Sequence, residues 1–277
     1  MILSFNPVVV TDKNIICAGR DPGPDEEKAI KKARAIILPQ GCRQSLYDMA
    51  TRCCRHVFPN YDTRFGYPGK IGQINLFKKL NLPHPKTITF SSLKEFHDKT
   101  GPLNDVSLFA IPFVFKFDWG GEGDNVFLIN SKKSLDEILK KAERYEQTGQ
   151  HGFLIQEFIP CANQSLRVVC IDQKRIAYWR MQTDPDQFVA AKSKGAVINK
   201  DNAPAKQKAG IKLIDMLCKK TGINLAGIDI LFPQTQKKNA PLLLEINYFF
   251  GRSGLGGSER FYELLNREVR NWINRLN

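Results

Sequence analysis

Three polar side chains near the C-terminal end of the chain could together bind a metal ion. Asp229 lies in one short apolar segment, Glu245 and Asn247 lie in a second, and a polar segment separates them, as in a β-hairpin. Side chains alternate along a strand, so Glu245 and Asn247 share a face, and a hairpin symmetric about Lys237 places Asp229 opposite Glu245. Such oxygen ligands suit a hard divalent cation that also binds phosphate. An isolated pattern of this kind is more often an ordinary solvent-facing hairpin.

A lysine followed by a glycine-rich turn could bind phosphate groups. Lys116 interrupts an aromatic strand, and Gly120, Gly121 and Gly123 follow before a second strand begins at Val126. Glycine permits positive φ and close approach of the backbone to a ligand, so this hairpin could close over phosphates. It differs from a P-loop, in which a lysine and a hydroxyl residue directly precede a helix.

Lys70 is a further candidate for contact with an anion. It precedes an amphipathic helix predicted over residues 71–80, and the helix dipole disfavours a cation at that end. A bound anion would compensate for this placement, and the alternative is a solvated lysine.

The composition is that of an ordinary globular protein. Of 277 residues, 42% are hydrophobic and 25% are charged, and no apolar segment is long enough to span a membrane. The first residues lack the basic segment of a secretory signal. The seven cysteines include the adjacent Cys53 and Cys54, so we expect free thiols in a reducing cytoplasm. With Cys42 and His56 they match no common zinc spacing and are predicted to be buried.

The formal net charge of +13 is spread along the chain without a dense basic tract. No zinc-finger, helix-turn-helix or RNP pattern accompanies it, so nucleic-acid binding is not favoured. A basic cleft that attracts nucleotides and acidic substrates fits the charge equally well.

The elements that must position these residues follow an α/β order. Alternating strands and helices over residues 1–85 indicate a small Rossmann-like lobe, and without a G-x-G-x-x-G segment a dinucleotide site is not expected. Strands are predicted at residues 8–10, 15–18, 35–38 and 56–59, and the first helix starts at Pro24. Further along, we expect a helix capped at residues 134–137, a buried strand at 153–160, helices from Pro204 and Ser258, and Tyr178 and Trp179 in the core.

The candidates also occur in a distinctive order. Lys70 is followed by His-Pro-Lys-Thr (84–87), Lys116 with its glycines, Gln-Glu-Phe-Ile (156–159), Leu-Arg-Val-Val (166–169), Gly-Ile-Asp-Ile-Leu (227–231) and Leu-Glu-Ile-Asn (244–247). This order resembles the ATP-grasp superfamily, closest to its RimK-type carboxylate–amine ligases, with glutathione synthetase and D-alanine–D-alanine ligase as more distant relatives. The resemblance covers residues 66–277.

The resemblance implies an α/β ATP-grasp fold in three parts. Residues 1–85 would form a Rossmann-like pre-ATP-grasp domain, residues 86–155 a subdomain with the glycine-rich phosphate loop, and residues 156–277 a subdomain with the metal and adenine-side site. It also implies ATP and Mg²⁺ (or Mn²⁺) as cofactors, and ligation of a carboxylate to an amine or thiol through an acyl phosphate.

The resemblance further assigns roles to individual residues. Nucleotide contacts fall on Lys70, Lys116, Gly120, Gly121, Gly123, Gln156, Glu157, Phe158, Ile159, Asn163 and Lys192. Catalytic roles fall on Arg180, Lys116 and Arg167. The magnesium ligands are Asp229, Glu245 and Asn247, and substrate contacts are expected at Arg20, Arg43, Arg252 and Ser253.

Three departures from the family pattern put the substrate in doubt. Ser165 replaces an acid, so ribose contact would shift to Asn163 or Gln164. Ala191 replaces an asparagine near the phosphates, for which Lys192 or Lys194 could compensate. The family pattern Asn-x-Ser-Pro-Gly is here Asn247 followed by Tyr-Phe-Phe-Gly (248–251), which changes the wall beside the metal.

Three functional hypotheses follow. The first is a cytoplasmic ligase acting on small-molecule or peptide carboxylates and amines, anionic in character, without membrane or nucleic-acid partners. The second is an ATP-grasp phosphotransferase or a non-ligating nucleotide-binding module. The third is a basic nucleic-acid or anionic-surface binder. The oligomeric state, a homo-oligomer included, stays open.

Overall fold

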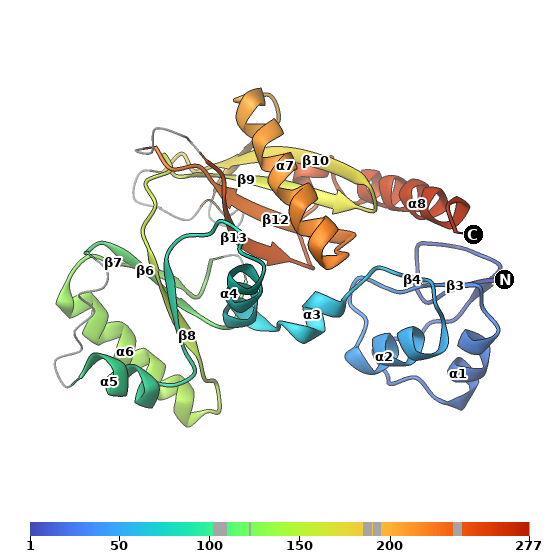
Figure 1. The fold of residues 1–277 in the computed structure, drawn as a ribbon, viewed down its shortest axis with the longest axis horizontal. Coiled ribbons are helices and arrows are strands. Elements are labelled where there is room, and N and C mark those ends of the chain that lie inside the picture. Colours follow the sequence, from blue (N-terminus) through green and yellow to red (C-terminus); the bar gives the residue numbers. More distant parts are fainter. Residues whose placement is uncertain (102–109, 122, 185–189, 191–194, 235–239, 277) are drawn as a thin grey trace.

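The described residues of this computed structural model form three β-sheets, each with its own helices, and helix α4 (Gly69–Lys79) lies between two of these sheets (Figure 1). The structure describes residues 1–101, 110–121, 123–184, 190, 195–234 and 240–276. The mixed α/β architecture agrees with the predicted fold class. In the part of the chain that is described, no helix is long and apolar enough to cross a membrane.

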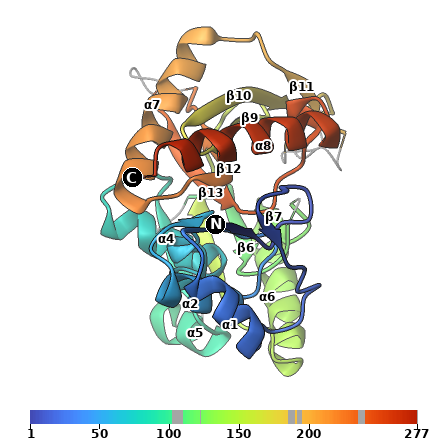
Figure 2. The ribbon, with the colours of Figure 1, turned by 90° about the vertical axis from the view of Figure 1, so that its right-hand side faces the viewer.

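The N-terminal sheet is parallel, as a Rossmann-like lobe requires. Its strands are β1 (Ile2–Ser4), β2 (Lys13–Asn14), β3 (Ala35–Ile37) and β4 (Val57–Phe58), in the order β2-β1-β3-β4. Helices α1 (Pro24–Lys31) and α2 (Gln44–Cys53) lie beside this sheet at one end of the molecule (Figures 1 and 2). The predictions of β3, β4 and the start of α1 are confirmed.

The strands predicted at residues 8–10 and 15–18 are wrong. The Nδ2 of Asn14 donates to the carbonyl of Val9 at 3.0 Å, and its Oδ1 accepts from the backbone N of Thr11 at 3.0 Å. Side chain–backbone bonds of this kind compete with the ladder of a strand. The chain therefore turns here, and strand β2 is limited to Lys13 and Asn14.

The second sheet carries the glycine-rich hairpin. It contains β5 (Thr87–Phe90), β6 (Phe113–Phe117), β7 (Val126–Ile129) and β8 (Phe153–Glu157), in the antiparallel order β5-β8-β6-β7. Helices α5 (Leu93–Thr100) and α6 (Lys132–Gln147) bury an aromatic core against it, in which the rings of Phe115 and Phe153 stack at 4.7 Å. Because side chains alternate, Val114 and Lys116 point to the opposite face.

The cap predicted for α6 at residues 134–137 is wrong by one turn. Ser131 is the N-cap, and its Oγ accepts from the backbone N of Ser134 at 3.1 Å, while the Oγ of Ser134 accepts from the backbone N of Ser131 at 3.2 Å. A serine at the third helical position makes the reciprocal bond that glutamate usually makes, so the helix starts earlier than expected.

The third sheet packs against a helix on each of its two faces. Its strands are β9 (Gln164–Ile171), β10 (Lys174–Met181), β11 (Val197–Asn199), β12 (Leu225–Leu231) and β13 (Leu242–Asn247), in the antiparallel order β11-β10-β9-β12-β13. Even-numbered residues of β9, such as Val168, pack in the core with α7 (Pro204–Thr221). Odd-numbered residues such as Val169 share the face covered by α8 (Ser258–Asn274). The predicted starts of both helices are confirmed.

Helix α4 ties the third sheet to the second. Its Gln73 makes two hydrogen bonds to the backbone of Ile246 on the edge strand β13, donating from Nε2 to the carbonyl and accepting at Oε1 from the amide, each at 2.8 Å. Two short helices, α3 (Asp62–Gly66) and the 3₁₀ helix η2 (Ser253–Leu255), complete the fold. The limit predicted between residues 155 and 156 falls within strand β8. The division into three domains remains a prediction.

Replacement of Gln73 by alanine should loosen this junction. The backbone amide and carbonyl of Ile246 would lose their partners, and an unsatisfied buried group costs about 1–3 kcal/mol. We expect the free energy of unfolding, measured by urea denaturation, to fall by that amount. Gln147→Ala, at an exposed position of α6, should change it by less than about 0.5 kcal/mol; equal losses for the two variants would contradict the role of Gln73.

Candidate active site

A cleft of about 420 Å³ lies between the second and third sheets, within the size range of small-molecule sites. It brings together most of the residues singled out from the sequence. These are Lys70, Lys116, Gly120, Gly121, Gly123, Gln156, Glu157, Phe158, Ile159, Arg167, Arg180, Asp229, Glu245, Asn247 and Ser253. Its other walls include Val114, Val126, Leu231 and Leu244, which offer an apolar slot beside the charges.

One row of side chains crosses the third sheet at the base of the cleft. Tyr178 pairs with Arg167, Arg167 with Asp229, and Asp229 with Glu245, on four successive strands. The predicted pairing of Asp229 with Glu245 is confirmed. The pairs from Gly227–Asn247 to Asp229–Glu245 follow the predicted symmetry. Towards the turn, a β-bulge between Asp229 and Ile230 shifts the register and leaves Leu244 as the extra residue.

The carboxylate of Asp229 is held by three neighbouring side chains. Arg167 donates from Nε and Nη2 to the two carboxylate oxygens at 2.8 and 2.7 Å, a bidentate geometry. The Nη2 of Arg180 lies 2.8 Å from Oδ2, and the Nδ2 of Asn247 donates to the same oxygen at 3.2 Å. Burial by itself would raise the pKa of Asp229, but the two guanidinium groups outweigh it and hold this pKa below its ordinary value.

Lys116 is a buried cation on the facing sheet. Its Nζ donates to Oε1 of Gln156 at 2.8 Å, and Nε2 of Gln156 donates in turn to Oγ1 of Thr87 at 2.9 Å. Burial lowers the pKa of Lys116 to about 8; Glu245 opposes this shift and the charge of Lys70 adds to it. An anion in the cleft would therefore stabilise the protonated form.

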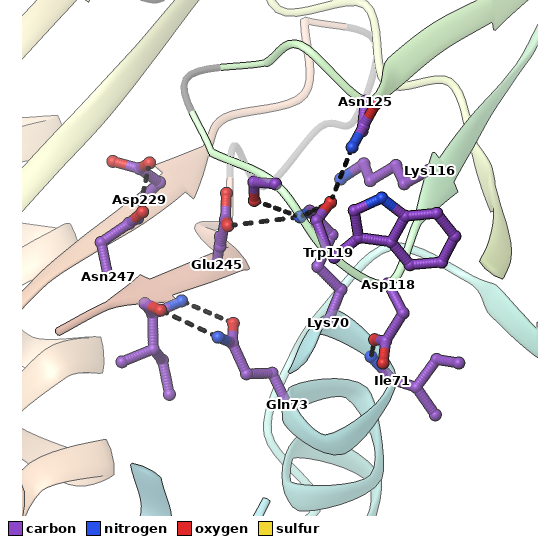
Figure 3. A network of polar contacts seen from close by, with 12 residues as sticks. Lys70, Ile71, Gln73, Lys116, Asp118, Trp119, Asn125, Asp229, Glu245 and Asn247 are labelled. Atoms are coloured by element: carbon purple, nitrogen blue, oxygen red, sulfur yellow. Dashed lines mark hydrogen bonds and ion pairs between the residues drawn. The ribbon is translucent and has the colours of Figure 1, made fainter. Parts of the chain in front are cut away.

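Lys70 contacts the glycine-rich segment directly (Figure 3). Its Nζ donates to the carbonyls of Gly120 at 2.9 Å and Trp119 at 3.3 Å, and lies 4.0 Å from Oε1 of Glu245. Asn125 donates from Nδ2 to the same Trp119 carbonyl at 3.3 Å. A single ammonium group thus joins helix α4, the glycine-rich segment and the edge strand β13.

The segment predicted to contact adenine leaves the second sheet at the cleft. Glu157 is anchored by Lys86, whose backbone N donates to Oε1 at 2.6 Å. The anchored carboxylate fixes where β8 ends, and Phe158 and Ile159 then line the cleft. Within the described residues, the buried Oε1 of Gln164 and Nε of Arg180 have no hydrogen-bond partner. Both residues line the cleft, although these two atoms are themselves enclosed by the protein.

Four predicted residues lie outside the cleft lining. Arg20 pairs with Glu26 at 2.6 Å and Arg43 lies 3.4 Å from Asp21, both in the N-terminal lobe. The lining includes Gln164 but not Asn163. Arg252 lines a neighbouring hollow, where its Nη1 donates to Tyr262 at 2.6 Å. Lys192, Ala191 and Lys194 lie outside the described residues.

Sequence reasoning missed three residues that organise the cleft. Gln73 and Asp118 bind backbone groups of distant segments, and Tyr178 lines the cleft as well as the core. The only sequence signal for Asp118 was its place between a lysine-bearing strand and a glycine-rich turn. The contacts of Gln73 and Tyr178 have no local pattern.

The oxygen donors fit a hard cation, with one qualification about Asp229. Glu245 and Asn247 supply a carboxylate and an amide oxygen, which Mg²⁺ prefers. Both oxygens of Asp229 already accept hydrogen bonds from arginine, so this residue would bind a metal only in exchange for those contacts. Among the described residues, no group of three or more His, Cys, Asp and Glu could hold a metal, the cysteines near His56 included.

The arrangement of two antiparallel sheets around this cleft, with a Rossmann-like lobe before them, is that of ATP-grasp proteins. The chain belongs to the RimK-like ATP-grasp domain family, whose match covers residues 69–262. No curated protein matches the sequence.

Solved structures share the fold at low sequence identity. A RimK-domain ATP-grasp protein from Sphaerobacter thermophilus has a TM-score of 0.61 and 13% identity, and the match covers 96% of this chain and 98% of that one. A D-alanine–D-alanine ligase from Bacillus anthracis has a TM-score of 0.60 and 13% identity, over 95% and 84% of the two chains. An N5-carboxyaminoimidazole synthetase from Staphylococcus aureus, complexed with ADP, has a TM-score of 0.62 and 12% identity, over 91% and 65%.

The chain is shorter than several of these proteins. It spans 64% and 63% of two further N5-carboxyaminoimidazole ribonucleotide synthetases, one with ADP and one from Thermotoga maritima. The shared fold is therefore established over nearly all of this chain, but only over part of those enzymes.

The depressed pKa of Lys116 predicts a pH dependence of stability. Between pH 8 and 10.5 the lysine is protonated in the unfolded chain and neutral in the fold, so stability should rise with pH over this window. Lys116→Met should remove as much as about 3 kcal/mol of that rise. Urea denaturation across the window measures it. Lys94→Met, at a side chain 85% exposed, should keep the wild-type slope, and an unchanged slope in Lys116→Met would refute the prediction.

Removal of the charge of Asp229 should destabilise the fold strongly. Asp229→Asn leaves Arg167 and Arg180 without their counter-ion, and breaking a buried pair costs about 3–5 kcal/mol. Because the pKa of Asp229 is depressed, its contribution is present above pH 3.8 and is lost as pH falls through the folded pKa.

Glu245→Gln is the matched control, since this carboxylate is 30% exposed and Asp229 only 4%. It should cost less than about 1 kcal/mol in the same urea measurement. Similar losses for both variants would show that the arginine contacts of Asp229 carry no special weight.

Proposed function

We propose that this chain is an ATP- and Mg²⁺-dependent ligase that joins a carboxylate to an amine, or to a thiol, through an acyl phosphate. The observation that carries the proposal is the convergence of charges in one cleft. Lys70, Lys116, Arg167 and Arg180 line it together with Glu157, Asp229 and Glu245. Membership of the RimK-like ATP-grasp domain family supports the same conclusion.

The chemistry needs positioning and charge neutralisation more than a nucleophile. A carboxylate is a poor electrophile, and phosphorylation by ATP converts it into an acyl phosphate that an amine can attack. Phosphoryl transfer depends on holding the groups in line and on balancing the phosphate charge. Lys70, Lys116 and Arg180 would bind phosphate oxygens, and burial of Lys116 would strengthen each electrostatic contact that it makes.

The remaining residues would divide the roles between base, ribose and metal. The apolar slot with Phe158 and Ile159 suits a purine, and Gln164 in the cleft wall would be the contact to the ribose. Mg²⁺ bound by Glu245 and Asn247 would neutralise phosphate charge. Asp229 would hold Arg167 and Arg180 in fixed positions beside that site.

The acceptor substrates are expected to be small or peptidic acids and amines of anionic character. Ser253 lines both the cleft and the neighbouring hollow that Arg252 lines, so a substrate could extend from one to the other. All seven cysteines are free thiols, and we propose that the enzyme acts in the reducing cytoplasm.

A screen for ADP release across amino acids, di-acids and peptides tests the proposal. Wild-type protein should release ADP only with an acid, and hydroxylamine should trap the acyl phosphate as a hydroxamate. Glu245→Gln should lower kcat on the order of 100-fold or more. Glu263→Gln, at an exposed position of α8, is the matched control and should keep full activity.

The other hypotheses give different results in the same screen. ADP release with a hydroxyl acceptor and no hydroxamate would identify a phosphotransferase. Nucleotide binding without turnover would identify a binding module. Failure to bind ATP, combined with salt-dependent association with RNA or DNA, would replace the ligase by a nucleic-acid binder.

A further inference from the structure

Asp118, directly after β6, links the glycine-rich segment to the helix that carries Lys70 (Figure 3). Its Oδ1 accepts from the backbone N of Ile71 at 2.7 Å, and its backbone carbonyl accepts from the backbone N of Lys70 at 3.3 Å. The start of α4 is thus capped by a residue that lies 47 positions away in the sequence.

The backbone at two glycines, Gly69 and Gly152, lies close to Asp118. Gly69 has φ +69°, and a Cβ there would lie 2.4 Å from Oδ2 of Asp118. On the other side, the backbone N of Asp118 donates to the carbonyl of Gly152 at 3.1 Å. Gly152 has φ +93°, and a Cβ at this residue would lie 3.4 Å from the Cβ of Asp118. A side chain at residue 69 would collide with the carboxylate, so glycine at this position permits the contact.

The contact also answers the unfavourable charge at the start of α4. The first turn of this helix contains no acidic residue and its N-cap, Pro68, has no side chain that could accept a hydrogen bond. Lys70 stands in that turn, where the helix dipole opposes a cation. The carboxylate of Asp118 supplies the missing negative charge and an acceptor for one of the free amides.

The contacts between the two elements run in both directions. Asp118 reaches from the glycine-rich segment to the backbone of α4, and Lys70 reaches from α4 to the carbonyls of Trp119 and Gly120. We propose that Asp118 is a positioning residue that holds Lys70 and the glycine-rich turn as one phosphate-binding unit. The proposal rests on the nucleotide site proposed above and adds a residue that does not itself line the cleft.

Nucleotide binding in a double-mutant cycle tests this role. Calorimetric titration of ATP in the presence of Mg²⁺ would compare wild type, Asp118→Ala, Lys70→Met and the double variant. Asp118→Ala should raise the Kd about tenfold, and in the Lys70→Met background the same change should raise it about twofold or less, since coupled residues are not additive. Asp118→Asn, which keeps an acceptor but not the charge, should fall between wild type and Asp118→Ala.

The control separates a positioning role from simple helix capping. Ser92 caps α5 by accepting from the backbone N of Glu95 at 3.2 Å, so Ser92→Ala should lower the melting temperature and leave the Kd unchanged. Two results would overturn the positioning role and leave the nucleotide site standing. One is a lower melting temperature of Asp118→Ala with an unchanged Kd. The other is a tenfold rise in Kd on adding Asp118→Ala to Lys70→Met. If Asp118→Ala does not fold, Asp118→Asn carries the same comparison. Absence of ATP binding by wild type would overturn the nucleotide site and this role together.

Discussion

The buried ion pair between Arg167 and Asp229 is the contact on which the cleft depends. The two residues face each other on neighbouring strands and form a bidentate pair, and both side chains are almost completely buried. Taking two charges out of water is costly unless both are fully hydrogen-bonded. Arg180 and Asn247 complete the bonding of the carboxylate. Four strands of the third sheet must therefore keep one register, and that register determines where Glu245 enters the cleft.

The facing wall is attached to this sheet through helix α4. Gln73 binds the edge of β13, and Lys70, one turn earlier, binds the glycine-rich segment of the second sheet. Helix α4 therefore helps to set the distance between the two charged walls, together with the short connection between β8 and β9 (residues 158–163). A shift of α4 along its axis would move Lys70 relative to both Glu245 and Gly120.

Local patterns were enough to predict part of the site and not the rest. The pairing of Asp229 with Glu245 follows from a hairpin, and Lys116 with its glycines follows from a strand and a turn, all within a few residues. The pair of Arg167 with Asp229 spans 62 positions, and no pattern in either strand specifies which strands are neighbours. The bulge at Leu244 likewise depends on the partner strand. In the N-terminal lobe the apolar runs at residues 8–10 and 15–18 predicted strands. The prediction failed because the side chain of Asn14 forms hydrogen bonds that compete with strand pairing, and a hydrophobicity pattern contains no information about such bonds.

The cleft contains a cation that the fold would be more stable without. Lys116 is buried against Gln156, its pKa is lowered to about 8, and a well-packed apolar side chain would avoid that desolvation cost. The carboxylates nearby compensate only in part, since both oxygens of Asp229 are already bound by arginine and Glu245 lies nearer to Lys70. A multiply charged anion in the cleft would stabilise the protonated lysine and could contact Lys70 as well. The cost of burying Lys116 therefore favours an anion-binding role over a purely structural one.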